Sequence, residues 1–276
     1  MLMDKCYPSR AHPAAGRLLR FAVAAWLLSP SLLPAAIHLS SAEARSIGRK
    51  IWQNECNGTV AGLTSWNAGE NFASLGIGHF IWYPAGQQGP FEESFPELVA
   101  FVSGHGAKLP QMLLGSGEMH CPWRSRSEFM LAQQKPDMKQ LRQFLADTVD
   151  LQTQFMVNRL DAALPKMLAE TSTAHRSQVQ DRFQRLAGSA RGCYALVDYV
   201  NFKGEGVLHT ERYSDQGWGL LQVLEHMRDA NGDTVREFSQ AAAAVLTRRV
   251  HNAPPSRNES RWLSGWIRRV TSYSRA

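Results

Sequence analysis

The chain has 276 residues, a formal net charge of +6 and a hydrophobic content of 44%. This length is enough for one large domain with a substantial core. We find no internal repeat, no low-complexity linker and no cysteine–histidine cluster, which excludes repeat arrays and gives no reason to expect a metal or a cofactor.

The first 44 residues have the pattern of a secretory signal peptide. Arg17 and Arg20 precede a short apolar run over residues 21–28, and small residues follow at Ala42-Glu43-Ala44. We therefore predict cleavage after Ala44 and an exported, periplasmic or secreted protein of residues 45–276. An uncleaved membrane anchor is the alternative, but prolines interrupt the run well short of the ~20 apolar residues that a span needs.

The positive charge is concentrated at the C-terminus, in residues 253–276 and the helix before them. Glu259 is the single acid among seven basic residues, which are Arg248, Arg249, Arg257, Arg261, Arg268, Arg269 and Arg275. Such a patch can attract an anionic wall polymer or membrane surface, or it can be an ordinary solvated helix face. Because we expect export, nucleic acid is not an expected partner. We expect a monomer.

Three cysteines follow the leader: Cys56, Cys121 and Cys193. An oxidising compartment permits one disulfide among them. We predict Cys56–Cys121, because it would join the turn after Glu55 to the loop at residues 121–123, although the spacing alone does not prove this pairing.

Residues 45–55 are predicted to form a short helix that ends at Asn57-Gly58. Glycines then alternate with apolar and aromatic residues over 59–84, which predicts a small antiparallel sheet. An exposed loop follows at 84–90.

Beyond this loop the helical period dominates. Apolar residues predict helices around 95–102, over 141–164 as two helices or one broken helix, and over 194–202, 218–227 and 238–250. We therefore predict an α+β fold, with residues 45–276 forming one mostly helical domain and a small sheet near its N-terminus.

Glu55 is the first candidate for catalysis. At the C-terminal end of a helix, the partial negative charge of the helix dipole disfavours an ionised carboxylate. A protonated carboxyl group can donate its proton to a glycosidic oxygen as general acid. The alternative is a surface glutamate beside a structural cysteine.

Three segments resemble the phage-type lysozyme (endolysin) family. Glu55 followed by Ser74-Leu75-Gly76-Ile77-Gly78-His79 is similar to the family's catalytic Glu and its Thr-Ile-Gly-x-Gly-His strand. Residues 195–199 with the glycines at 204 and 206, and residues 245–250, are similar to two later family segments in the same order. The resemblance implies a lysozyme-like fold, Glu55 as general acid, and Ser74 in place of the family Thr.

The chain also departs from this pattern. Asn67 stands nearest the position of the family's Asp, and it cannot act as a nucleophile or general base. Glu70 is the nearest acid and can take that role only if the turn folds differently. Residues 85–190 are much longer than the family's equivalent, and we read them as an enlarged helical insertion.

Substrate contacts are expected from the aromatic turn and from a second polar cluster. Aromatic rings in the turn are candidates for stacking on sugars, and about half of them are expected to belong to the core. The candidate substrate-binding residues are Trp66, Asn67, His79, Trp82, Asn201, Glu205 and Glu211. Glu205 or Glu211 is also an alternative to Glu55 as the acid. His79 is a further candidate to hold its strand against a helix acid such as Asp198.

The expected function is cleavage of a β-1,4-linked amino-sugar polymer, most plausibly peptidoglycan. Hydrolysis normally uses two carboxylates. With Glu55 alone, the sugar's acetamido group can act instead, as in lytic transglycosylases. The sequence is also compatible with a chitin- or chitosan-cleaving enzyme and with a catalytically inactive wall-binding protein.

Overall fold

The helix that carries Glu55 begins earlier than the sequence predicts. In the computed structural model, which describes residues 37–89, 91–115, 119–229 and 232–275, α1 spans Ser41–Cys56. Ser40 and Glu43 cap its first turn reciprocally, and Ala44 is fully buried. The predicted boundary after Ala44 therefore falls inside α1, whereas most of the predicted leader lies outside the described residues.

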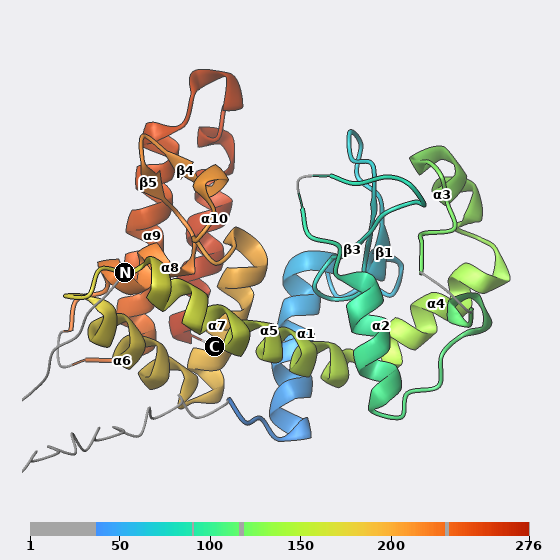
Figure 1. Ribbon diagram of the computed structural model, residues 1–276, viewed down its shortest axis with the longest axis horizontal. Helices are drawn as coiled ribbons and strands as arrows, with labels where there is room; N and C mark the ends of the chain where they lie inside the picture. The colour runs from blue at the N-terminus through green and yellow to red at the C-terminus, as the bar shows by residue number, and fades with distance from the viewer. Residues whose placement is uncertain (1–36, 90, 116–118, 230–231, 276) are drawn as a thin grey trace, which may run out of the picture. The chain divides into compact units, whose positions relative to one another are not determined.

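The end of α1 and the sheet that follows agree with the prediction. Asn57 caps α1 in the left-handed conformation (φ 52°). Three antiparallel strands follow in the order β1 (Thr64–Ser65), β2 (Ala73–Leu75) and β3 (Phe80–Trp82) (Figure 1). Gly76 and His79 both have positive φ, which makes the tight turn between β2 and β3. This turn brings His79 back toward α1.

Helices make up most of the remaining chain, which confirms the α+β class (Figure 1). The helices are α2 (Phe95–Gly104), α3 (Arg126–Ala132), α4 (Pro136–Asp147), α5 (Val149–Glu170), α6 (Arg176–Ala187), α7 (Ala190–Lys203), α8 (Leu220–His226), α9 (Thr234–Asn252) and α10 (Ser260–Ser272). Short 3₁₀ turns cover Ala61–Leu63, Gln111–Leu113, His209–Glu211, Pro255–Arg257 and Tyr273–Arg275. A hairpin of β4 (Arg212–Tyr213) and β5 (Gln216–Gly217) precedes α8.

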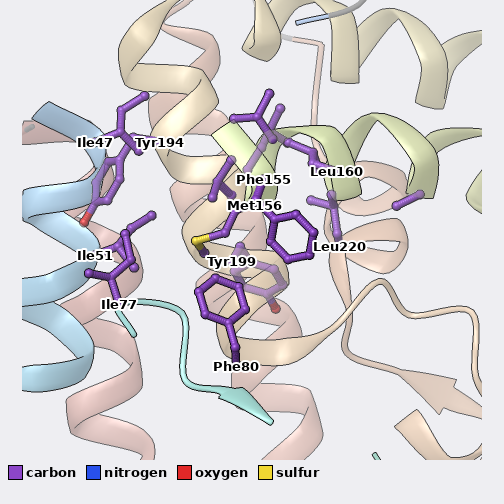
Figure 2. Packing of buried hydrophobic residues seen from close by; sticks show 14 of the residues in the cluster. Ile47, Ile51, Ile77, Phe80, Phe155, Met156, Leu160, Tyr194, Tyr199 and Leu220 are labelled. Carbon is purple, nitrogen blue, oxygen red and sulfur yellow. The ribbon is translucent and has the colours of Figure 1, made fainter. Parts of the chain in front are cut away.

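The core that positions the site lies between α1, α5 and α7. Ile47 and Ile51 of α1 face Tyr194 of α7, and Phe155 and Met156 come from α5 (Figure 2). Each such buried side chain contributes roughly 1.5–3 kcal/mol relative to an exposed one. This packing holds the C-terminal turn of α1 against α7.

The last two helices, α9 and α10, pack against each other, and the 3₁₀ turn at Tyr273–Arg275 contacts α7. Tyr273 is fully buried. Through this packing, residues near the C-terminus reach the end of α1. Within the described ranges, no helix is both long and apolar enough to cross a bilayer.

Candidate active site

Glu55 lies in the last turn of α1, and its side chain is 14% exposed. Its carboxylate contacts side chains from three other elements. His79 Nδ1 from the β2–β3 turn lies 3.4 Å from Oε2, and Asn201 Nδ2 of α7 donates to Oε1 at 3.3 Å. Arg269 of α10 forms an ion pair with the same Oε1. Glu55 is therefore a fixed, nearly buried carboxyl group.

The guanidinium of Arg269 is shared with a second carboxylate. Arg269 Nε and Nη2 each donate to Asp198 at 2.8 Å, and Asp198 is fully buried in α7. Tyr273 donates its hydroxyl to Asp198 at 2.6 Å, and Asn54 donates to it at 3.0 Å. Two carboxylates thus share one guanidinium, and Asp198 accepts two of its three hydrogen bonds to them.

Lys203, the last residue of α7, is a second basic group near Glu55. Burial, and then the positive charge of Arg249, lower the pKa of Lys203 to about 6. Its Nζ lies 3.3 Å from the ring centre of Trp266 and 4.0 Å from that of Phe202. It forms no ion pair with any acid in the part of the chain that the structure describes.

A pocket of about 240 Å³ adjoins the Glu55 site. It is smaller than the ~300–1,000 Å³ of typical ligand sites, so it can hold only part of a larger ligand. His79 and Asn201, which both contact Glu55, belong to its lining. The walls combine polar and apolar side chains, which also include Phe91, Met156, Arg159 and Glu205.

Ser74 lies at the centre of the sheet. It pairs with Ser65 and Ile81, is 4% exposed, and accepts a hydrogen bond from Ser65 at its backbone carbonyl. Its position in β2 agrees with the strand expected there. Among the described residues, no hydrogen bond joins its hydroxyl to Glu55.

Glu70 and Asn67 lie in the turn between β1 and β2 and contact each other. Asn67 Nδ2 donates to Glu70 Oε1 at 3.2 Å, and the backbone carbonyl of Glu70 accepts from the indole of Trp66 at 2.8 Å. Neither side chain is hydrogen-bonded to Glu55. Glu70 is therefore not part of the Glu55 cluster, and its expected role as the second carboxylate has no support from a contact.

The prediction that Trp66 and Trp82 stack on sugars is wrong. Trp66 is 4% exposed and packs on Phe129, and Trp82 is 1% exposed and packs on Phe95. Neither ring has an open face. Both Trp66 and Trp82 belong to the core, as expected for about half of these aromatic residues. The sheet buries Trp82 against α2 and Trp66 against α3.

The predicted Cys56–Cys121 disulfide is also wrong. Both residues are free, as is Cys193. Burial, followed by the charge of Glu55, raises the pKa of Cys56 to about 12, and burial raises the pKa of Cys121 to about 12. Cys56 Sγ instead lies 3.7 Å from His79 Nε2, and Cys121 donates its backbone amide to the carbonyl of Tyr83.

Glu205 and Glu211 have different surroundings. Glu205 lines the pocket and lies 3.6 Å from Lys166 Nζ. Glu211 accepts the backbone amide of Gly206 at 2.8 Å, and burial raises its pKa. Glu211 thus holds the backbone of its own loop, whereas Glu205 is placed to contact a ligand.

Sequence reasoning missed the main partners of Glu55. Arg269 appeared only as one of several C-terminal arginines, and it lies 214 residues from Glu55 in the chain. Asp198 was expected to pair with His79, but it pairs with Arg269. One signal for this pair was available: an acid lies in the buried part of α7, and an arginine lies in the amphipathic last helix.

No protein-family model, curated protein or solved structure matches this chain. Among the described residues, no group of three or more His, Cys, Asp or Glu side chains is arranged to hold a metal ion.

Proposed function

We propose that this protein is an exported glycosidase that cleaves a β-1,4-linked amino-sugar polymer, most plausibly peptidoglycan, with Glu55 as general acid. The observation that carries the proposal is the Glu55 carboxylate, 14% exposed and bound to two residues that line the adjoining pocket. The resemblance to endolysins supports the same residue.

The surroundings of Glu55 are compatible with proton donation. Asp198 receives two hydrogen bonds from Arg269 and already neutralises its charge. With a proton on Glu55, the cluster of Glu55, Asp198 and Arg269 is therefore neutral. Transfer of that proton to the leaving glycosidic oxygen gives a Glu55 carboxylate, which Arg269 stabilises. Asn201 can fix the orientation of the carboxyl group through its amide.

The second step can proceed in two ways. In hydrolysis, Glu205 on the pocket wall is the best-placed carboxylate to activate water. In a lytic transglycosylase, the substrate's acetamido oxygen bonds C1 as the glycosidic oxygen leaves with the proton of Glu55. The C6 hydroxyl of the same sugar then displaces the acetamido oxygen from C1 and returns a proton to Glu55, which gives an anhydro end without a second carboxylate. Glu70 bonds Asn67 rather than any member of the Glu55 cluster, so it is not our candidate in either route.

The test compares the wild-type protein with Glu55→Gln on purified peptidoglycan and on chitosan. We expect Glu55→Gln to reduce the rate by at least about 100-fold, because it removes the acid while keeping the size of the side chain. Glu170→Gln, which changes an exposed acid at the C-terminal end of α5 outside the pocket lining, is the matched control. A wild type that binds polymer without cleaving it would refute the activity, and a fully active Glu55→Gln would refute the site. Mass spectrometry of the fragments distinguishes reducing ends from anhydro ends.

A further inference from the structure

The outer surface of α10 and of the short 3₁₀ turns before and after it carries positive charge without nearby exposed acids. Arg257, Arg261, Arg268 and Arg275 are exposed, and none forms an ion pair with any acid that the structure describes. Glu259 is the single acid in this segment, but it is 4% exposed and is bound by Arg249 and Tyr213. The surface charge is therefore available to an external anion.

Arg261 and Arg268 are seven residues apart, so they lie on the same side of α10. Between them on that side are Ser264 and Gly265, both exposed, and a side chain at Gly265 would meet no atom within 4 Å. Two cations thus lie on either side of a stretch of helix with small side chains. An extended polymer chain can approach the helix closely there.

Aromatic rings connect this surface to the Glu55 site. Trp262 is 44% exposed, has the Arg261 guanidinium 4.2 Å from its ring centre, and stacks on Trp266 at an angle of 26°. Trp266 contacts Phe202 edge-on, and the guanidinium of Arg269, which binds Glu55, lies 4.2 Å from the Phe202 ring centre. A chain of ring contacts therefore links this surface to the Glu55 site.

We propose that the α10 surface, defined as Arg257, Arg261, Trp262 and Arg268, binds a polysaccharide that carries anionic groups along its chain. The charge of these residues selects an anion, and the exposed part of the Trp262 indole offers apolar surface to sugar rings. That the anionic groups belong to a polysaccharide rests on the proposed function. This binding is separate from cleavage, and it keeps the protein attached to its polymer.

A membrane is the less favoured occupant. An interfacial helix needs an apolar face that inserts into the lipid. On α10 the apolar residues other than Trp262 are buried or half-buried against the rest of the domain, and Trp262 already packs on Trp266 and Arg261. What remains exposed is charge plus one ring edge, which fits a hydrated polymer better.

The experiment measures co-sedimentation of the full-length protein, in a Glu55→Gln background, with insoluble peptidoglycan. The same polymer with its carboxylates amidated tests the charge requirement. Vesicles of neutral and of anionic phospholipid form a separate arm. We expect salt-sensitive binding to the native polymer, little binding to the amidated polymer, and weaker binding to both kinds of vesicle.

The decisive variant is Arg257→Gln/Arg261→Gln/Arg268→Gln, which we expect to weaken binding about tenfold. Its matched control, Lys108→Gln/Lys135→Gln/Lys139→Gln, removes the same charge from exposed residues elsewhere in the chain and should leave binding within about twofold. Trp262→Ala should weaken binding a further few-fold.

Equal losses in the two triple variants would overturn the proposal, because net charge alone would then explain binding. Equal binding to the amidated polymer, or tighter binding to anionic vesicles, would also overturn it. The binding result is independent of cleavage. A protein that binds through the α10 surface but cleaves nothing supports this inference and refutes the proposed function. A protein that cleaves the polymer but does not bind through the α10 surface refutes this inference and leaves the proposed function standing.

Discussion

At the scale of single residues, the behaviour of Glu55 depends on how Arg269 divides its contacts. Asp198 is buried and receives two hydrogen bonds from Arg269, whereas Glu55 is slightly exposed and shares the same cation. The sequence alone predicted Glu55 as a candidate acid but not this competition, because the three side chains come from α1, α7 and α10. The competition can be tested by removing the charge of Asp198.

We expect Asp198→Asn to destabilise the fold by about 3–5 kcal/mol, because it breaks the buried pair of Asp198 with Arg269. In this variant Glu55 is the remaining carboxylate partner of Arg269, so we also expect the rate of the proposed cleavage to fall. Urea denaturation, and cleavage assays below the melting temperature of the variant, check the two expectations. Unchanged stability would contradict the first, and an unchanged rate would contradict the second.

Lys203 gives a second prediction at this scale. The pKa of Lys203 is lowered to about 6 by burial and by Arg249, so between pH 6 and 10 the unfolded chain binds one more proton than the folded chain. The stability of the wild type should therefore rise with pH in that window relative to Lys203→Met, by at most about 1.4 kcal/mol per pH unit. The variant's advantage is greatest below pH 6.

Urea denaturation of both proteins at pH 6, 7 and 8 measures this difference. Lys139→Met, which changes an exposed lysine, is the control and should show no such trend. The difference in unfolding free energy between the wild type and Lys203→Met could also be the same at every pH. That result would show that the ammonium of Lys203 is not destabilised by its surroundings in the folded protein.

At the scale of elements, the N-terminal turn of α1 bears on where the mature chain begins. Ser40, Glu43 and Ala44 contribute a capping box and a buried contact, and the amide of Ile37 donates to Asp161 at 3.0 Å. Cleavage after Ala44 would remove all of these interactions. Cleavage at the predicted site would therefore make the fold less stable.

We expect a chain that begins at Arg45 to melt at a lower temperature than one that begins at Ile37. Loss of an N-cap alone costs about 1 kcal/mol, which corresponds to roughly 2–4 °C in a domain of this size. Ser40→Ala in the longer chain isolates the cap and should account for only part of the difference. Thermal melts followed by circular dichroism provide the measurement, and equal melting temperatures would refute a structural role for residues 37–44.

Local patterns predicted most elements but not all. The helices around 95–102, 194–202 and 238–250 were found because their apolar residues repeat with the helical period. The β4–β5 hairpin was missed because its turn uses Ser214 and Asp215 at positive φ, where glycine or asparagine is the usual signal. Helix α6 was missed although Val179, Phe183 and Leu186 lie on one face.

At the scale of the whole molecule, the three cysteines that the structure describes are free, so the fold has to be stable without a disulfide among them. A bridge between Cys56 and Cys121 would stabilise the fold by about 4 kcal/mol in the chain-entropy model. Because both thiols are free and buried, we expect the melting temperature under oxidising conditions to be the same with and without a reductant. Thiol titration under denaturing conditions should find every cysteine between 37 and 276 reduced. A fall of several degrees on reduction would restore the disulfide prediction.

The sequence by itself determined the class of fold, the end of α1 at Asn57, the sheet at 59–84 and the candidate acid, because these follow from periodicity and turn chemistry over a few neighbouring residues. Only the tertiary structure decided which side chains meet. It buried Trp66 and Trp82, separated Cys56 from Cys121, and brought Arg269 to Glu55 across 214 residues. Such contacts depend on how helices pack in three dimensions, and no local pattern in the chain encodes them.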